Sequence, residues 1–206
     1  LGYHIDIFDQ KARIGGSARL IPNFRLPKEM IDEDTSFLLA SAKKNIEVKT
    51  GETVNNFDKL IKSEYSAVVL SGGLSESIKL GIKNEEYAID FTKYLDNPER
   101  YDYKGRVGIV GGGATAMDCA FSAKKYGAKE VTIFALENIY EMVVPEEEIK
   151  WFQDEGIGLQ SRVKLSSINI TNNKISAITI NDVELLCEKF DLSKIHDVEG
   201  TERTRE

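Results

Sequence analysis

The sequence predicts an α/β protein made of two successive strand–helix–strand units. Short runs rich in β-branched and aromatic residues alternate with amphipathic runs through both halves of the chain. This alternation is typical of a parallel sheet covered by helices. A second observation is a glycine-rich loop at Gly111–Ala116, which directly follows a strand-like run and directly precedes a helix-like run.

The first half contains three expected strands and two expected helices. Pro27 occupies a position typical of a first helical residue, and apolar residues follow it at helical spacing. The dipeptide Gly15-Gly16 marks a turn, and Ser71-Gly72-Gly73 follows the third strand. The expected strands are residues 4–9, 46–49 and 67–70, and the helices run from Pro27 to about Lys44 and from Phe57 to Ser63.

Residues 90–104 resemble a crossover into the second half, which has its own expected order of elements. Lys124 and Lys125 in a last turn before Gly127, and three glutamates after Pro145, are the charges that helix ends favour. We expect strands at 106–110 and 130–134, helices from Ala114 to Gly127 and from Pro145 to Gly156, and a hairpin with Asn172-Asn173 at its turn. The polar end, residues 198–206, shows no clear element.

The bulk composition narrows the function classes. The chain has 206 residues, of which 41% are apolar and 30% charged, and a net charge of −7. No apolar run approaches the roughly 18 residues that a membrane helix needs, and the acidic balance disfavours nucleic acid and anionic membrane as partners. Two distant cysteines do not suggest a disulfide scaffold or a metal site. We therefore expect a cytoplasmic protein without a bound metal.

The loop Gly111-Gly112-Gly113-Ala114-Thr115-Ala116 has the spacing of the Rossmann dinucleotide fingerprint, G-x-G-x-x-G/A, in its proper context. Gly111 would permit the tight turn, Gly113 would let a pyrophosphate approach the backbone, and Ala116 would let helix and strand pack closely. The helix start supplies free N–H groups and a partial positive charge. The pattern predicts a site for a dinucleotide of the NAD class, while an ordinary tight turn is the alternative.

Glu137 lies 21 residues beyond Ala116 and just past the second strand of this unit. An acid at that place accepts hydrogen bonds from the 2′-hydroxyl of the adenosine ribose. A surface acid after a strand is also common, and this alternative stays open. No serine–histidine–acid set or pair of carboxylates emerges, so the sequence identifies no catalytic residue.

Other chemistry-bearing residues have a structural alternative. His4 and His196 are isolated from other metal-ligand types, which favours structural or solvated roles. Asp118 either orients the glycine loop or faces solvent, and Cys119 suits a buried helix face better than a redox thiol.

Three stretches together identify a resemblance to a known family. They are residues 20–27 (LIPNFRLP), 111–118 (GGGATAMD) and 127–132 (GAKEVT). The chain resembles flavin-dependent NAD(P)H oxidoreductases of the glutamate synthase small-subunit type. That group also includes the flavoprotein part of dihydropyrimidine dehydrogenase and a proposed selenate reductase subunit.

The resemblance implies an FAD/NAD(P)-binding Rossmann-like fold with two dinucleotide-binding units. Residues 1–95 would be a partial FAD-binding domain that lacks its first strand and glycine loop. Residues 104–206 would be an NAD(P)-binding domain that lacks its last strand. Hydride would pass from NAD(P)H to FAD, and electrons would continue to a partner subunit or domain of a kind that can carry iron–sulfur clusters.

The resemblance also implies roles for residues of the first unit. Asp9 would hold the ribose of the FAD adenosine, and Val54 would lie near the adenine. Gly15, Gly16 and Arg19 would lie near the diphosphate or the flavin ring. Ser71-Gly72-Gly73 would stand in for the family's Ala-Thr-Gly turn.

Two departures from the family pattern affect the expected cofactor. The family often has two arginines that grip the 2′-phosphate of NADPH where this chain has Leu136 and Glu137, which favours NAD over NADP. Ala114 replaces the usual Asn of the loop, which weakens the expected site.

Two alternatives remain beside the oxidoreductase interpretation. The chain could be a nucleotide-binding module without catalysis, or a degenerate domain that binds neither cofactor. We expect the 206-residue chain on its own to bind FAD poorly, because it lacks the glycine loop that would hold the diphosphate.

Overall fold

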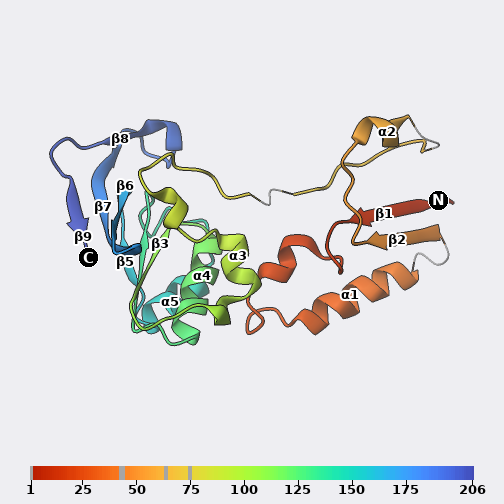
Figure 1. Cartoon of the computed structure of the whole chain (residues 1–206), viewed down its shortest axis with the longest axis horizontal. Helices are drawn as coiled ribbons and strands as arrows, with labels where there is room; N and C mark the ends of the chain where they lie inside the picture. The colour runs from red at the N-terminus through yellow and green to blue at the C-terminus, as the bar shows by residue number, and fades with distance from the viewer. Residues whose placement is uncertain (1, 42–44, 63–64, 74–75) are drawn as a thin grey trace. The chain divides into compact units, whose positions relative to one another are not determined.

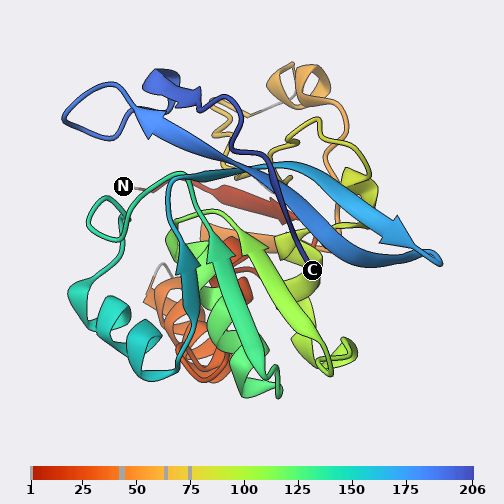
Figure 2. The same ribbon diagram turned by 90° about the vertical axis from the view of Figure 1, so that its left-hand side faces the viewer.

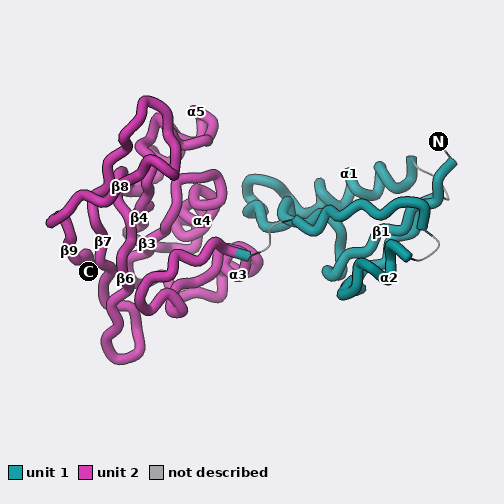
Figure 3. The backbone as a smooth tube through the Cα atoms, turned by 90° about the horizontal axis from the view of Figure 1, so that it is seen from above, with its two compact units in different colours: residues 1–76 teal, residues 77–206 magenta. Residues whose placement is uncertain are grey.

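The computed structural model describes residues 2–41, 45–62, 65–73 and 76–206. The chain divides into two compact units, residues 1–76 and 77–206 (Figure 3). Each unit is α/β, as the sequence predicts.

The first unit contains a two-stranded parallel sheet. Strand β1 (Ile5–Asp9) pairs with β2 (Ile46–Thr50) in a register that places Ile5 beside Ile46 and Asp9 beside Thr50 (Figure 1). Parallel pairing requires a long crossover connection. The crossover contains the 3₁₀-helix η1 (Gly16–Leu20) and helix α1 (Lys28–Ser41). The two predicted strands are confirmed, and the predicted helix end near Lys44 lies outside the described residues.

The end of the first unit differs from the prediction. Helix α2 (Phe57–Ile61) forms as expected, and its N-cap Asn56 accepts from the backbone N–H of Lys59 at 2.9 Å. Its expected end at Ser63 falls outside the described residues. The predicted strand at 67–70 is wrong, because these residues form no strand and Val69 is 87% exposed. An apolar run becomes a strand only when a neighbouring strand takes its N–H and C=O groups, and none among the described residues does so.

Residues 77–104 pack as part of the second unit. They contain η3 (Glu85–Tyr87), α3 (Phe91–Asp96) and η4 (Pro98–Arg100). The side-chain amide of Asn84 donates to the carbonyl of Ile168 at 2.6 Å, and the buried hydroxyl of Tyr94 donates to the carbonyl of Cys119 at 3.4 Å. The predicted crossover at 90–104 therefore includes a helix. The assignment of residues 1–95 and 104–206 to two cofactor domains stays a prediction.

The second unit is built on a three-stranded parallel sheet in the order β3-β4-β5. Its strands β3 (Arg106–Val110), β4 (Glu130–Phe134) and β5 (Gly158–Gln160) lie side by side, with α4 (Ala114–Lys125) behind them in Figure 2. Helix α5 (Glu146–Asp154) connects β4 to β5. The predicted strand–loop–helix–strand sequence over 106–134 is confirmed.

Helix α4 is the most deeply buried helix element described in this unit. Met117 is 1% exposed and Ala120 and Ala123 are fully buried, because small side chains let the helix lie close to the sheet. Phe121 of α4 stacks on Trp151 of α5 with ring centroids 4.0 Å apart, and this contact packs the two helices against each other. Gly127 ends the helix with a φ of +102°, as expected of a C-terminal glycine.

An antiparallel sheet follows the parallel one. Strands β6 (Val163–Thr171) and β7 (Lys174–Leu185) form the predicted hairpin, and Asn172 and Asn173 have φ values of +52° and +60° at its turn. The 3₁₀-helix η5 (Leu192–Lys194) follows the hairpin. Two short strands then pair with β7, namely β8 (Ile195–Asp197) and β9 (Arg203–Arg205). The expectation that residues 198–206 hold no element is wrong, because β7 supplies the hydrogen-bonding edge that a polar tripeptide needs.

The two units differ in the size of their cores. Among the described residues of the first unit, Pro22 and Ile31 are the buried apolar side chains, while Phe37 and Leu38 are 74% and 64% exposed. In the second unit a cluster of buried apolar residues joins the end of β4 to the hairpin, and it consists of Phe134, Val163, Leu165, Ile168 and Ile180. Apolar burial is the main favourable contribution to folding, so we expect the second unit to be the more stable one.

This difference predicts unequal protection from hydrogen exchange in the intact chain. Amides of β1 and β2 should exchange at least about a hundredfold faster than those of β3 and β4, because local opening exposes little apolar surface in the first unit. Native-state exchange followed by mass spectrometry measures both. Equal protection of the two sheets would show that the first unit has a source of stability that its burial does not reveal.

Candidate dinucleotide-binding site

The loop between β3 and α4 has the geometry that the glycine pattern predicts. Gly111 has a φ of +125°, a region that only glycine adopts without strain. Its N–H donates to the carbonyl of Phe134 at 2.9 Å, which anchors the turn to the end of β4. A Cβ at Gly111 would lie 4.0 Å from the Cβ of Ala116, so a larger residue at Ala116 would crowd the loop.

The N-terminus of α4 is open where a phosphate would approach. Gly113 is the N-cap residue, and no side chain caps the helix. A Cβ at Gly113 would meet no atom within 4 Å, and Gly113, Ala114 and Thr115 are exposed. Within the described part of the chain, no acceptor takes the N–H groups of these three residues. Free N–H groups together with the helix dipole fit an anion such as a pyrophosphate.

Glu137 lies directly over the glycine loop. A Cβ built on Gly112 would be 2.5 Å from Oε2 of Glu137 and 2.8 Å from its Cδ. The tertiary structure therefore brings the carboxylate and the loop together across 25 residues of sequence, as the dinucleotide interpretation requires. The steric role of Gly112 is not predicted by the dinucleotide fingerprint, although the run of three consecutive glycines is a signal that could have indicated it.

Residues next to the loop on α4 serve the core. Asp118 is 7% exposed, so the solvent-facing alternative for this residue is wrong. Burial raises the pKa of the Cys119 thiol to about 12, which keeps it protonated and unsuited to redox exchange near neutral pH. Both cysteines are free, Cys119 being buried and Cys187 exposed.

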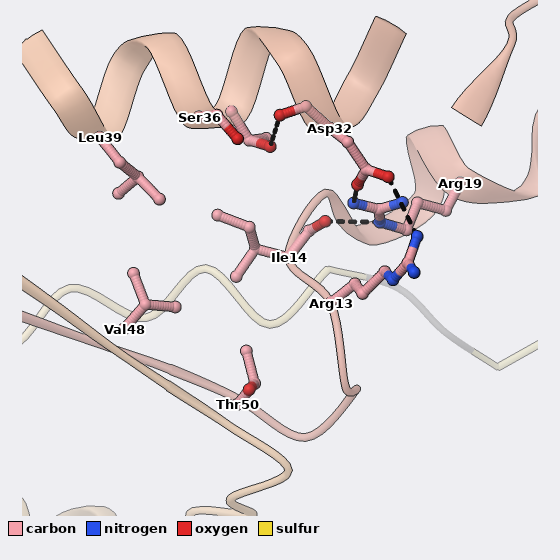
Figure 4. Close-up of a pocket in the computed structure, with 9 residues that line it drawn as sticks. Arg13, Ile14, Arg19, Asp32, Ser36, Leu39, Val48 and Thr50 are labelled. Carbon is pink, nitrogen blue, oxygen red and sulfur yellow. Dashed lines mark hydrogen bonds and ion pairs between the residues drawn. The ribbon is translucent and has the colours of Figure 1, made fainter. Parts of the chain in front are cut away.

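The first unit contains a pocket of about 300 Å³ between α1, β2 and the loop that follows β1 (Figure 4). Arg19 lies in its wall, where its guanidinium pairs with Asp32 of α1 and its Nε donates to the carbonyl of Ile14. Arg13 pairs with the other oxygen of Asp32 at 3.0 Å. The hydrogen bond from Arg19 holds the pKa of the Asp32 carboxyl below its usual value.

The remaining residues that the resemblance assigned to FAD are spread over this unit. One oxygen of Asp9, at the end of β1, accepts the backbone N–H of Lys11 at 2.8 Å. Gly15 and Gly16 have φ values of +124° and +53°. A Cβ on Gly15 would lie 3.0 Å from Nε of Arg19, so this glycine and Arg19 are in close contact. Val54 is half-buried, whereas Ser71 and Gly72 are exposed and belong to no element. The roles assigned to these residues stay predictions.

The described residues contain no group of three or more histidine, cysteine or acidic side chains that could hold a metal ion. No helix in the described ranges is long and apolar enough to cross a membrane.

Comparison with known proteins identifies the family. The sequence profile of the pyridine nucleotide-disulphide oxidoreductases matches residues 10–191, which cover both units. The chain belongs to this family. The resemblance noted from the sequence is thereby confirmed, and the fold is that of the FAD/NAD(P)-binding Rossmann-type reductases.

Curated relatives are 30% identical to this chain over the aligned residues. The small chain of NADPH glutamate synthase from Escherichia coli K12 is 30% identical over 200 residues, which are 87% of this chain and 42% of that protein. Subunit PreT of NAD-dependent dihydropyrimidine dehydrogenase from the same organism is 30% identical over 77% of this chain and 39% of its own length. The beta subunit of NADP(+)-dependent formate dehydrogenase from Moorella thermoacetica is 30% identical over 76% of this chain and 23% of its own length. The chain thus spans less than half the length of these relatives.

Solved structures show the same fold at low sequence identity. FprA of Mycobacterium tuberculosis, solved in complex with NADPH, superposes with a TM-score of 0.76 at 13% identity over 98% of this chain and 61% of that chain. Thioredoxin reductase of T. acidophilum gives a TM-score of 0.62 at 15% identity over 99% of this chain and 66% of that chain.

The contact between Gly112 and Glu137 predicts the effect of one methyl group. Gly112 does not have a positive φ, so alanine fits its backbone, but the new Cβ must push the Glu137 carboxylate aside. The variant Gly112→Ala should stay folded and lose about tenfold in NADH affinity, or ~1.4 kcal/mol, the size of one lost hydrogen bond to a charged group. Isothermal titration calorimetry with NADH and NADPH measures this.

Gly113→Ala is the matched control. Its Cβ meets no protein atom, so it should weaken both nucleotides equally by obstructing the phosphate and leave their affinity ratio unchanged. Equal ratios in Gly112→Ala and the wild type would mean that Glu137 does not contact the nucleotide.

Proposed function

We propose that this chain is part of a flavin-linked NAD(P)H oxidoreductase and that its second unit binds the nicotinamide dinucleotide. The observation that carries the proposal is the juxtaposition of the open N-terminus of α4 with Glu137 over the same glycine loop. Membership of the pyridine nucleotide-disulphide oxidoreductases supports it. In the complete protein, electrons would pass through FAD to a partner subunit or domain, since the glutamate synthase, dihydropyrimidine dehydrogenase and formate dehydrogenase relatives are named as chains or subunits of larger enzymes.

The chain's own residues would bind and orient the dinucleotide. The N–H groups of Gly113, Ala114 and Thr115 would donate to the pyrophosphate, and the α4 dipole would favour its negative charge. The Glu137 carboxylate would accept hydrogen bonds from the ribose hydroxyls of the adenosine half. When bound, the nicotinamide supplies a hydride that flavin accepts, and the protein supplies binding and orientation. Ala114 offers no side-chain hydrogen bond, so backbone groups would carry the phosphate contact.

Cofactor choice would depend on the charge of Glu137. A carboxylate makes charge-assisted hydrogen bonds to ribose hydroxyls of about 1.5–3 kcal/mol each in favourable cases. The same carboxylate meets like charge in a 2′-phosphate, with a Coulomb cost of a few kcal/mol at ~4 Å near a protein surface. Both contributions shrink with solvent screening because Glu137 is half-exposed. We therefore propose NADH as the preferred donor, by about tenfold to hundredfold.

Reversing the charge at this position should reverse the preference. The double variant Leu136→Arg with Glu137→Arg restores a guanidinium fork for the 2′-phosphate and should bind NADPH about tenfold more tightly than NADH. Calorimetric titration of both nucleotides into both proteins is the measurement. A wild type that prefers NADPH, or a variant with an unchanged ratio, would exclude Glu137 as the ribose ligand. Failure of either nucleotide to bind at millimolar concentration would favour the degenerate-domain alternative.

Flavin binding tests the first unit separately. Residues 1–76 contain no G-x-G-x-x-G loop, and among those described only Pro22 and Ile31 are buried apolar side chains. The diphosphate of FAD would therefore lack its main backbone contact in this 206-residue chain. We expect a colourless preparation and no stoichiometric FAD by absorbance near ~450 nm, where a flavoprotein absorbs. A yellow protein with one FAD per chain would show that Asp9, Gly15 and Gly16 suffice.

A further inference from the structure

The peptide groups on both sides of Glu137 are hydrogen-bonded by two side chains, one from the same loop and one from the turn after β5. The carbonyl of Leu136 accepts a hydrogen bond from Nη1 of Arg162 at 3.0 Å. The backbone N–H of Asn138 donates to Oε2 of Glu141 at 2.9 Å. Arg162 and Glu141 are themselves joined, with Nη2 of Arg162 donating to Oε1 of Glu141 at 2.6 Å. One continuous set of hydrogen bonds therefore encloses Glu137 from its preceding residue to its following residue.

Arg162 is held firmly enough to act as a support. It lies in the turn between β5 and β6, where its carbonyl accepts the N–H of Val183 at 2.9 Å. Its side chain is 28% exposed and that of Glu141 is 18% exposed, so water competes weakly for their contacts. Burial pushes the pKa of Glu141 upward, but the Asn138 N–H and the Arg162 guanidinium together hold it below its usual value. The carboxylate is therefore charged and paired near neutral pH.

The backbone conformation at position 162 does not favour arginine. Its φ of +55° lies in the left-handed region, where glycine is unstrained and arginine is not. Local strain of this kind persists where surrounding contacts stabilise it, and it is common near functional sites. Here the contacts are those of the guanidinium with Leu136 and Glu141.

We infer that Arg162 and Glu141 are positioning residues that fix the Glu137 carboxylate over the glycine loop and thereby set the choice between a ribose hydroxyl and a ribose phosphate. In this role each residue acts through the backbone on one side of Glu137, Arg162 through the carbonyl of Leu136 and Glu141 through the N–H of Asn138. This inference rests on the proposed function of the glycine loop. It extends the specificity site from Glu137, three residues after β4, to Arg162, 25 residues further along the chain.

A positioning role and a purely electrostatic role predict opposite results for Arg162→Gly, whereas for Glu141→Gln both predict a smaller NADH preference. Arg162→Gly removes a cation, which by charge alone would disfavour NADPH further. Glu141→Gln removes an anion, which by charge alone would favour NADPH. If the pair positions Glu137, both variants must reduce the NADH preference, because each releases one side of the loop that carries the carboxylate. Glycine also suits the left-handed backbone at position 162, so this variant loses the side chain without added strain.

The experiment measures the dissociation constants of NADH and NADPH for the full chain and its variants by calorimetry. We expect the NADH preference to fall from about tenfold to hundredfold in the wild type to about threefold or less in Arg162→Gly and in Glu141→Gln, because small displacements of an oriented group are costly. Arg203→Ala is a matched control, since Arg203 also pairs with a carboxylate, Asp182 at 2.6 Å, and donates to a carbonyl, that of Thr201. The control should keep the wild-type ratio.

Two further measurements separate positioning from general destabilisation. In a Glu137→Gln background, Arg162→Gly should leave the nucleotide ratio unchanged, because the group it positions has already lost its charge. Without any nucleotide, the amide of Asn138 should exchange faster in Arg162→Gly than in Arg203→Ala, and circular dichroism should report the same fold for both.

The outcomes are distinguishable. An unchanged or increased NADH preference in Arg162→Gly, or an unchanged hydrogen-exchange rate of the Asn138 amide, would overturn the inference while leaving the proposed function intact. A wild type that binds neither nucleotide would overturn the proposed function and this inference with it.

Discussion

The second unit depends on how closely α4 approaches the parallel sheet. The chain passes from the end of β3 to the first turn of α4 through Gly111, Gly112 and Gly113, and this passage needs a positive φ at Gly111. Small side chains on the sheet-facing side of the helix, including Ala116 and Ala120, keep the helix close to the strands. Close packing places the uncapped helix N-terminus at the carboxyl edge of the sheet. A ligand-binding geometry thus follows from a packing requirement, because the same small residues serve both.

The edge formed by β3 and β4 also determines what the loop can recognise. Since β3 and β4 are parallel, the residues that follow Val110 and Phe134 emerge at the same edge. Glu137 is one of these residues, and its carboxylate occupies the space that a side chain on Gly112 would fill. Glycine is therefore required at position 112 because the Glu137 carboxylate occupies the space of a side chain there, and not because of the backbone angles of Gly112. In the proposed function, this contact would couple recognition of phosphate to recognition of ribose.

The contacts that hold the backbone around Glu137 come partly from the turn between β5 and β6, which a minimal strand–loop–helix–strand Rossmann pattern does not include. The turn that leads into the antiparallel strands carries Arg162, and β7 anchors that turn through Val183. Arg162 reaches back to the loop after β4, where Glu141 continues the contact to Asn138. By this inference, the turn that leads into the antiparallel sheet would contribute to the proposed nucleotide site on the parallel sheet. In contrast, the first unit has little core among its described residues, and its Arg19–Asp32 pair stabilises a turn whose role toward FAD remains a prediction.

Local sequence patterns determined the strands at β1 to β4, the glycine loop, helices α1, α4 and α5, and the hairpin turn at Asn172-Asn173. These features depend on periodicity, capping and positive φ, all of which short segments encode by themselves. The tertiary structure decided the rest. Residues 67–70 have a strand-like composition but form no strand, whereas the polar Arg203–Arg205 does, because hydrogen bonding to a neighbouring edge determines strand formation. The contact of Gly112 with Glu137 and the contacts of Arg162 with Leu136 and Glu141 join residues 21 or more positions apart, and no local pattern specifies which distant side chain fills a given space.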